Sequence, residues 1–251
     1  MAAAGHGGIT GVTFGSDGHT LVGTLYLARG DDPKPTALLL HGCPGIEKNH
    51  DLAAALRDRG WNALVFHYRG CWGSGGRYDL RTVTTDIAAA AGHLRSGAHR
   101  SVDGGRLAVI GHSLGGWAGI LAAAEDERLG AVAVCAAPAS LDVLDGLTGE
   151  DLDREFIRFL ATTPAEFAAQ RTEVAARPGP LQVAASVSPR PLLVVHGSDD
   201  EWVPACHGRS LYEHAARPCR YVEINGANHA FSWHRAELRD ALLAWLEESE
   251  V

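Results

Sequence analysis

The sequence predicts an α/β protein in which a mostly parallel sheet is covered by helices on both faces. Short apolar runs of strand length alternate with segments of helical spacing, which is the pattern of parallel strands joined by helical crossovers. Polar clusters that contain glycine follow Leu40, His67, Ile110, Val195 and Ile224. Because ligands bind at the carboxyl ends of the strands in such sheets, this convergence favours an enzyme.

The first half of the chain is expected to begin with an edge hairpin and continue into the sheet. Apolar runs at residues 9–14 and 21–27 flank a glycine-bearing turn at residues 15–18, which predicts two antiparallel strands. A helix at residues 51–59 should end at Gly60. The other elements expected here are strands at residues 37–40, 61–67 and 107–110 and helices at residues 84–96 and 117–125.

The second half interrupts the alternating pattern at residues 138–189. Thr148 and Asp151 have the spacing of a capping box that opens one helix, and Thr163, which is followed by proline, opens a second. We interpret residues 138–189 as a small helical lid inserted into a single domain that spans residues 1–251. The elements expected here are strands at residues 131–136, 191–196 and 220–224 and helices at residues 148–161, 163–176, 208–216 and 235–248.

The composition argues against a nucleic-acid or anionic-membrane partner and favours a reducing compartment. The formal net charge is −8, whereas binding of nucleic acid or of an anionic membrane requires clustered Lys and Arg. No apolar stretch approaches the ~18 residues of a membrane span, and no secretory signal is visible. The five cysteines show no C-x-x-C spacing, so we expect free thiols and a cytoplasmic location. No metal-ligand or phosphate-cradle motif is present, and we expect neither a metal nor a cofactor.

Ser113 is the candidate nucleophile. Gly111, Ser113 and Gly115 form a G-x-S-x-G pattern between the strand at residues 107–110 and the helix at residues 117–125. A serine at such a corner exposes its hydroxyl, and the start of the following helix offers unpaired N–H groups to an oxyanion. A glycine-rich turn before a helix is the simpler interpretation, and the partner residues decide between the two.

The serine needs a general base, and His229 is the histidine best placed for this role. It follows the last expected strand, and it comes last in the chain order Ser, Asp, His that this architecture uses. His214 and His234 lie on or beside expected helices, where we expect them to be solvated. His112 is adjacent to Ser113, so its side chain is expected to leave the corner in another direction.

The acid that orients the base is expected between the serine and the histidine, at another strand end. Asp199 and Asp200 both follow the strand at residues 191–196, and either also suits a turn or a helix cap. Asp142 follows an earlier strand and is a weaker candidate.

Two backbone N–H groups are expected to bind the oxyanion. Leu114 directly follows the serine, and Cys43 lies in the loop after the strand at residues 37–40, where this architecture takes its second donor. Cys43 is also a rival nucleophile, but no histidine–carboxylate pair lies near it in the sequence.

Aromatic residues near the expected site loops are candidates for an apolar substrate pocket. Trp72, Trp202 and Phe231 are the substrate-binding candidates, and core packing is an equally good explanation for each. Arg69, in the loop after the strand at residues 61–67, is expected to anchor that loop by hydrogen bonds rather than to contact the substrate.

These motifs resemble those of serine hydrolases of the α/β-hydrolase superfamily over nearly the whole chain. The resemblance rests on His-Gly-Cys-Pro-Gly at residues 41–45, Gly-His-Ser-Leu-Gly-Gly at residues 111–116 and Gly-Ala-Asn-His at residues 226–229. It includes an H-G-x-x-D-x-x-V-P run at residues 196–204, which implies that Asp200 is the acid. Small bacterial esterases and acyl-aminoacyl-peptidase-like hydrolases are the most similar proteins, although this chain lacks the β-propeller of the larger peptidases.

The resemblance implies a hydrolase that cleaves a carboxylic ester or related acyl bond of a small molecule. In this hypothesis Ser113 attacks the acyl carbon, His229 moves the proton and Asp200 orients the histidine. An acyltransferase, thioesterase or cyclase of a biosynthetic pathway, or a small peptidase, would use the same residues. A binding module without catalysis is the remaining hypothesis.

Overall fold

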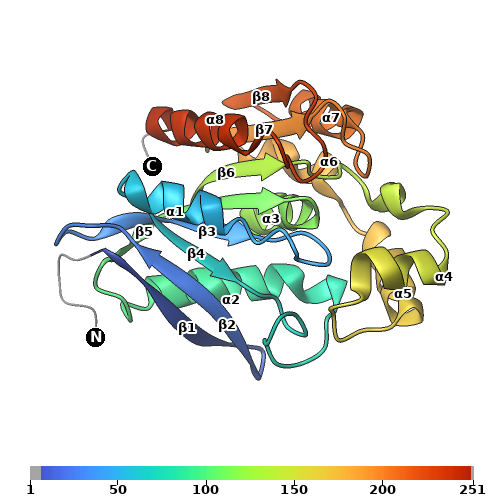
Figure 1. Ribbon diagram of the computed structural model, residues 1–251, viewed down its shortest axis with the longest axis horizontal. Coiled ribbons are helices and arrows are strands. Elements are labelled where there is room, and N and C mark those ends of the chain that lie inside the picture. Colours follow the sequence, from blue (N-terminus) through green and yellow to red (C-terminus); the bar gives the residue numbers. More distant parts are fainter. Residues whose placement is uncertain (1–6, 250–251) are drawn as a thin grey trace.

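An eight-stranded sheet forms the centre of the protein (Figure 1). The computed structural model describes residues 7–249. The strand order is β1-β2-β4-β3-β5-β6-β7-β8; β2 pairs antiparallel with β1 and β4, and all other neighbours pair parallel. The predicted α/β fold with an antiparallel N-terminal hairpin is therefore confirmed. The strands are β1 (Gly8–Ser16), β2 (His19–Leu27), β3 (Lys34–Leu40), β4 (Asn62–Phe66), β5 (Val102–His112), β6 (Leu129–Cys135), β7 (Leu192–Gly197) and β8 (Cys219–Ile224).

Helices cover both faces of this sheet. The pair α1 and α8 lies on one face, and α2, α3 and α7 lie on the other (Figure 1). In β3, Leu38 and Leu40 belong to the core under α2 and α3, whereas Ala37 and Leu39 pack toward α1 and α8. Burial on both faces explains why this strand is apolar at successive positions. The helices are α1 (His50–Asp58), α2 (Val83–Arg95), α3 (Leu114–Glu125), α7 (Ala205–His214) and α8 (Arg235–Glu248).

Helix α3 begins at Leu114, earlier than the sequence predicts, and its first turn contains two glycines that pack closely against other backbone segments. A Cβ atom at Gly115 would lie 2.3 Å from the carbonyl oxygen of Leu40. A Cβ atom at Gly116 would lie 2.6 Å from the Cβ atom of Ala137. These glycines let the helix start press against the loops that follow β3 and β6.

In residues 138–189, the part that contains α4 and α5 lies beyond the carboxyl ends of the parallel strands, at the right of Figure 1, whereas the last part, with α6, runs back along α3. The capping box predicted at Thr148 and the N-cap predicted at Thr163 are confirmed, and Thr163 also forms a capping box, with Glu166. The single helix predicted at residues 148–161 is wrong, because α-helical geometry ends at Asp151 and a π-helical turn follows. The elements of this segment are the turn η2 (Leu141–Leu144), α4 (Gly149–Asp151), the π turn η3 (Leu152–Ile157), α5 (Pro164–Ala175), α6 (Pro180–Val183) and the turn η4 (Ala184–Val187).

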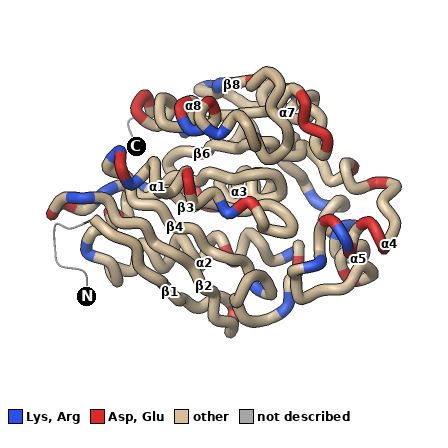
Figure 2. The backbone as a smooth tube through the Cα atoms, in the orientation of Figure 1, with Lys and Arg blue, Asp and Glu red and all other residues tan. Residues whose placement is uncertain are grey.

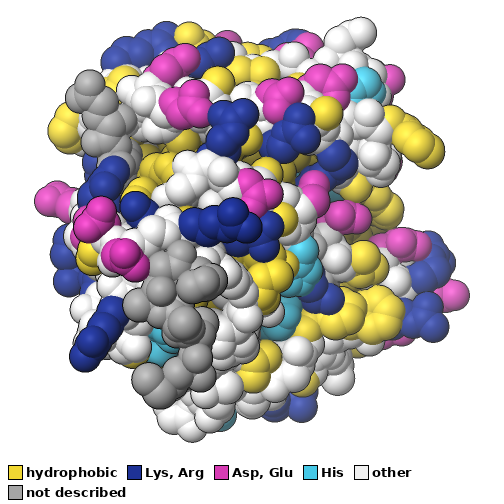
Figure 3. Space-filling view, turned by 60° about the vertical axis from the view of Figure 1, so that its left-hand side comes forward, with side chains coloured by type: hydrophobic (Ala, Val, Ile, Leu, Met, Phe, Trp, Pro, Cys, Tyr) yellow, Lys and Arg dark blue, Asp and Glu magenta, His cyan; other side chains and the backbone are white. Residues whose placement is uncertain are grey.

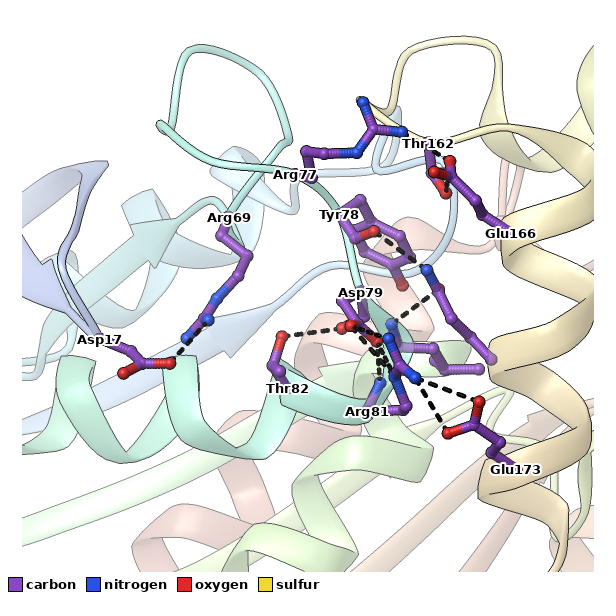
Figure 4. Close-up of polar contacts among 12 residues, drawn as sticks. Asp17, Arg69, Arg77, Tyr78, Asp79, Arg81, Thr82, Thr162, Glu166 and Glu173 are labelled. Carbon is purple, nitrogen blue, oxygen red and sulfur yellow. Dashed lines mark hydrogen bonds and ion pairs between the residues drawn. The ribbon is translucent and has the colours of Figure 1, made fainter.

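Two ion pairs fasten α5 to the loop that precedes α2 (Figure 4). Arg77 pairs with Glu166 at 2.6 Å, and Arg81 pairs with Glu173 at 2.9 Å. Exposed pairs of this kind contribute little each, but the backbone N–H of Tyr78 also bonds to the loop before α5. The α5 side of the segment is therefore attached to the main body at several points.

Acidic and basic side chains are interspersed along the chain (Figure 2) and neighbour one another on the face seen in Figure 3. Within residues 7–249, no helix combines the length and the apolar character that crossing a membrane requires.

Candidate active site

Ser113 occupies the sharp corner between β5 and α3. Its backbone has φ 54° and ψ −126°, and a conformation of this kind costs a non-glycine residue about 1–3 kcal/mol. The Ser113 N–H donates to the carbonyl oxygen of Cys135 at 2.8 Å, which holds the corner against the end of β6. At Gly111, a Cβ atom would lie 2.3 Å from the carbonyl oxygen of Gly115, so this position admits only glycine. The glycine spacing of the motif thus has a steric cause.

His229 and Asp200 form a hydrogen-bonded pair. The Nδ1 atom of His229 lies 2.9 Å from both carboxylate oxygens of Asp200. An ionised carboxylate only accepts hydrogen bonds, so Nδ1 carries the proton and donates it. This assignment leaves the lone pair on Nε2, which is the tautomer that a general base requires.

The surroundings of Asp200 keep it ionised. Its side chain is fully buried, and burial alone would raise its pKa. Hydrogen bonds from His196 and His229, together with the backbone N–H of Val203 at 2.7 Å, instead hold the pKa of Asp200 well below its usual range. The charged carboxylate therefore accepts the hydrogen bond that orients the His229 ring.

Asp199 and Asp142 have other partners. The Asp199 carboxylate accepts from the hydroxyl of Ser198 at 2.7 Å, and its backbone N–H donates to Ala227 at 3.0 Å. Asp142 accepts from the Ser140 hydroxyl. Asp200 is thus the one of these three carboxylates that the described structure pairs with His229.

Two cavities meet at the serine. The inner cavity has a volume of about 30 Å³. Apart from Ser113 and His229, its wall consists mainly of apolar side chains. The outer cavity has a volume of about 190 Å³ and includes Glu47 and Glu155. The residues that line both are Cys43, Ser113, Phe156, Trp202 and His229.

Leu114 and Cys43, the predicted oxyanion donors, line the inner cavity together with Ser113. Leu114 is the first residue of α3, where backbone N–H groups have no partner within the helix. Gly42 brings the β3 loop close to the serine, since a Cβ atom there would lie 2.7 Å from that of Ser113. The thiol of Cys43 donates to the carbonyl oxygen of Phe156 at 3.0 Å, and burial raises its pKa to about 12. A thiol with this pKa supplies almost no thiolate, which argues against Cys43 as the nucleophile.

Two histidines support the site in ways that sequence reasoning missed. The Nε2 atom of His112 donates to the backbone carbonyl of His229 at 2.8 Å, and the two rings lie 5.0 Å apart. The Nε2 atom of His196 donates to the carbonyl of Val203 at 2.8 Å and lies 3.4 Å from Asp200. These contacts join segments far apart in the sequence, so no local spacing reveals them.

The predicted anchoring role of Arg69 is confirmed. Its guanidinium donates to Asp86 at 2.8 and 3.0 Å, and its backbone N–H donates to the same carboxylate at 2.9 Å. Both side chains are nearly or fully buried. Ser16 completes the cluster, and Asp17 extends it toward the surface (Figure 4). The loop after β4 is therefore attached to α2 by charge-assisted hydrogen bonds.

The three aromatic substrate-binding candidates lie in different places. Trp202 lines both cavities and packs edge-to-face on Phe156, with ring centroids 5.3 Å apart. The Trp72 ring packs against Phe159 in a tilted arrangement, and its indole nitrogen donates to the carbonyl oxygen of Pro44 at 2.8 Å. Phe231 is fully buried in the core and lines neither cavity among the described residues. Of the three, Trp202 is the one beside the serine.

All five cysteines are free thiols, as predicted. Across residues 7–249, no three or more His, Cys, Asp or Glu side chains are grouped so that they could hold a metal ion.

The fold and the order of its strands are those of the α/β hydrolases. The sequence pattern of the alpha/beta hydrolase family matches residues 37–241, and the chain belongs to this family. The uncharacterized protein YfhR of Salmonella typhimurium is 29% identical over 226 residues, which cover 87% of this chain and 73% of YfhR. The putative esterase YheT of Escherichia coli is 30% identical over 156 residues, 60% of this chain and 45% of YheT. The solved structure of Est1E from Butyrivibrio proteoclasticus with ferulic acid bound has a TM-score of 0.79 at 20% identity, and the match covers 95% of this chain and 98% of Est1E. Membership of this family supports a hydrolase activity.

Proposed function

We propose that the protein is a serine hydrolase that cleaves a carboxylic ester through an acyl-enzyme. The observation that carries this proposal is the pairing of His229 with both oxygens of Asp200, beside a cavity that His229 shares with the strained Ser113. A nucleophile, a base with its lone pair on Nε2 and a charged orienting acid are the parts that acyl transfer requires.

In the first step, Ser113 Oγ attacks the carbonyl carbon of the ester while its proton moves to Nε2 of His229. A new C–O bond forms, and the carbonyl oxygen takes the negative charge. The backbone N–H groups of Leu114 and Cys43 are proposed to bind this oxyanion, and each such donor contributes roughly 2.7–4 kcal/mol in the transition state. Proton transfer by a positioned histidine adds about 10²–10⁴-fold.

In the second step, the tetrahedral intermediate collapses. The bond to the alcohol breaks, and His229 returns its proton to the leaving oxygen. A water molecule then gives a proton to His229 and attacks the acyl carbon. The bond from that carbon to Ser113 Oγ breaks, His229 passes its proton to Oγ, and the free acid leaves. The charge of Asp200 stabilises His229 each time the ring is protonated.

The two cavities support a direction for the substrate. The inner cavity offers apolar contacts to an acyl chain, whereas the wall of the outer cavity also contains the carboxylates of Glu47 and Glu155. We therefore assign the acyl group to the inner cavity and the alcohol to the outer one. Residues 138–189 then act as a roof over the acyl group, attached at α5 by the contacts to Arg77 and Arg81.

The test is Ser113-dependent turnover of p-nitrophenyl butyrate. The protein should hydrolyse this ester, and a fluorophosphonate should label Ser113 by mass spectrometry. Ser113→Ala should abolish both. Cys43→Ala keeps the backbone N–H and serves as the matched control, so it should retain activity within a few-fold. Equal turnover by Ser113→Ala and the unchanged protein would overturn the proposal.

Acyl transfer to a second substrate is the alternative that one observation favours. Ser113 is only 9% exposed under Phe156 and Trp202, and a shielded acyl-enzyme excludes water. Product analysis with an added alcohol or amine distinguishes the two outcomes. Formation of the new ester or amide in preference to the free acid would identify a transferase, a cyclase or a related enzyme.

A further inference from the structure

A third, much larger cavity shares one wall with the inner cavity. This flank cavity lies between residues 139–145 and residues 171–182 and has a volume of about 840 Å³. It is open to solvent, and its lining combines apolar side chains such as Trp117, Val174 and Leu181 with charged ones such as Asp142 and Arg177. Among the described residues, Leu141 is the one that lines both the flank cavity and the inner cavity.

The difference in volume decides what each cavity can hold. A cavity needs roughly 10–15 Å³ on this measure to hold one water molecule. The inner cavity therefore has room for a group about the size of two water molecules. This room suits an acyl chain of a few carbons. The flank cavity has space for a long alkyl chain, but Leu141 lies between it and the serine.

Neighbouring contacts fix the position of Leu141. It is the first residue of η2 and is 6% exposed. The turn is closed by a hydrogen bond of 2.8 Å from the backbone N–H of Asp145 to the carbonyl oxygen of Asp142. Arg171 of α5 then forms an ion pair with Asp145 at 2.6 Å. The turn that carries Leu141 is therefore attached to α5 by hydrogen bonding and an ion pair.

We propose that Leu141 is the residue that sets the acyl-chain length of this enzyme. Its side chain closes the inner cavity and restricts the natural substrates to esters of short-chain acids. Removal of the side chain joins the inner cavity to the flank cavity, where a longer chain can lie against Trp117 and Val174. This inference rests on the proposed ester hydrolase activity of Ser113.

The experiment measures kcat/KM for p-nitrophenyl acetate, butyrate, octanoate and dodecanoate. The unchanged protein should prefer acetate and butyrate. Each additional methylene group that is buried raises kcat/KM by about fourfold. Octanoate has four more methylenes than butyrate, and part of this extension stays solvated. Leu141→Ala should therefore raise the ratio of kcat/KM for octanoate to that for butyrate by about tenfold or more. Dodecanoate should gain as well.

Leu144→Ala is the matched control. Leu144 lies in the same turn, is 8% exposed and lines the inner cavity without lining the flank cavity. Its truncation enlarges the inner cavity without opening it, so the optimum should move by one or two carbons and dodecanoate should not gain. Leu141→Val, a smaller change, should give an intermediate shift and keeps the test open if Leu141→Ala does not fold.

Two results would overturn the inference. One is an unchanged protein that already cleaves dodecanoate as well as butyrate. The other is an equal chain-length profile for the folded Leu141 and Leu144 variants. In both cases Ser113-dependent hydrolysis would still stand, whereas loss of all ester turnover and of fluorophosphonate labelling in the unchanged protein would refute the underlying activity instead.

Discussion

The Nε2 atom of His112 donates a hydrogen bond of 2.8 Å to the backbone carbonyl oxygen of His229. The residue next to the proposed nucleophile thus holds the loop of the proposed base. This contact fixes the distance between the β5 corner and the loop after β8, although the two residues are far apart in the sequence. It makes His112 a positioning residue.

Loss of this contact should lower the rate of the acylation step. A hydrogen bond of this kind contributes about 0.5–1.5 kcal/mol, and an unsatisfied buried carbonyl costs about 1–3 kcal/mol. His112→Leu should therefore reduce kcat by about tenfold with little change in KM. His112→Gln retains an N–H donor and should recover part of the loss. Equal kcat values for the two variants would show that the hydrogen bond does not matter.

Asp200 and Asp199 should respond very differently to the same substitution. Asp200→Asn changes the partner of His229 and favours the wrong tautomer, which should reduce kcat by roughly 10³–10⁴-fold. Asp199→Asn alters an exposed turn residue and should stay within about threefold of the unchanged protein. Steady-state hydrolysis of p-nitrophenyl butyrate measures both. A larger loss for Asp199→Asn would reverse the assignment.

Stability should fall as the pH falls below neutrality. Burial lowers the pKa of His112 to about 3 and that of His41 to about 4, whereas unfolded histidine titrates near ~6.5. Below about pH 6.5 the unfolded chain therefore binds protons that the folded protein does not bind. The resulting loss is about 1.4 kcal/mol per pH unit for each such ring, down to the pKa in the folded state. The depressed pKa of Asp200 adds a further loss below about pH 4.

Urea unfolding at a series of pH values tests this expectation. The free energy of unfolding should be nearly constant above about pH 7 and should decline steeply toward about pH 4. His112→Gln removes one of the buried rings and should reduce that slope by about 1.4 kcal/mol per pH unit. A flat profile over the same range would contradict the burial of neutral histidines.

The attachment of α5 should depend on Gln170 more than on the exposed ion pairs. The Gln170 side chain is buried, accepts from the backbone N–H of Leu80 at 3.1 Å and donates to the carbonyl of Tyr78 at 3.4 Å. Gln170→Leu leaves both backbone groups without this partner and should cost about 1–3 kcal/mol. Glu173→Gln breaks an exposed pair with Arg81 and should cost less than about 1 kcal/mol.

Hydrogen exchange provides the readout for this attachment. The Leu80 amide and the first turns of α5 should exchange faster in Gln170→Leu, while the central strands keep their protection. Equal exchange in Gln170→Leu and Glu173→Gln would mean that residues 138–189 are held in another way.

The sequence predicted those features that have a local steric or packing cause. A Cβ atom at residue 111 or 115 would lie 2.3 Å from a backbone oxygen, so both positions require glycine. The corner at Ser113 is therefore visible in the sequence as the G-x-S-x-G spacing. Strands β3, β4 and β7 are apolar because both their faces are buried, so their positions could also be predicted. The insertion of β4 between β2 and β3 has no local signal, because it depends on which strands pair over long distances.

The parts that could not be predicted depend on tertiary contacts. The π turn at Leu152–Ile157 replaces the expected helix where the carbonyl of Phe156 accepts from the thiol of Cys43. Phe231 carries the same apolar chemistry whether it lines a pocket or fills a core, and it fills the core. The choice between Asp199 and Asp200 rested on resemblance, since adjacent aspartates in a loop differ only in which way their side chains turn.

The buried ion pair of Arg69 and Asp86 also limits the routes by which this sequence can change. Replacing one partner leaves the other charge buried without compensation, at a cost of about 3–5 kcal/mol, which is a large part of the about 5–15 kcal/mol that holds a typical domain folded. Replacing both by apolar residues of similar volume is often neutral. A sequence with only one of the two charges is therefore less stable than a sequence with both or with neither. Diverged copies of this chain should keep both charges or have lost both, and an intermediate with one should survive only where a stabilising change elsewhere came first.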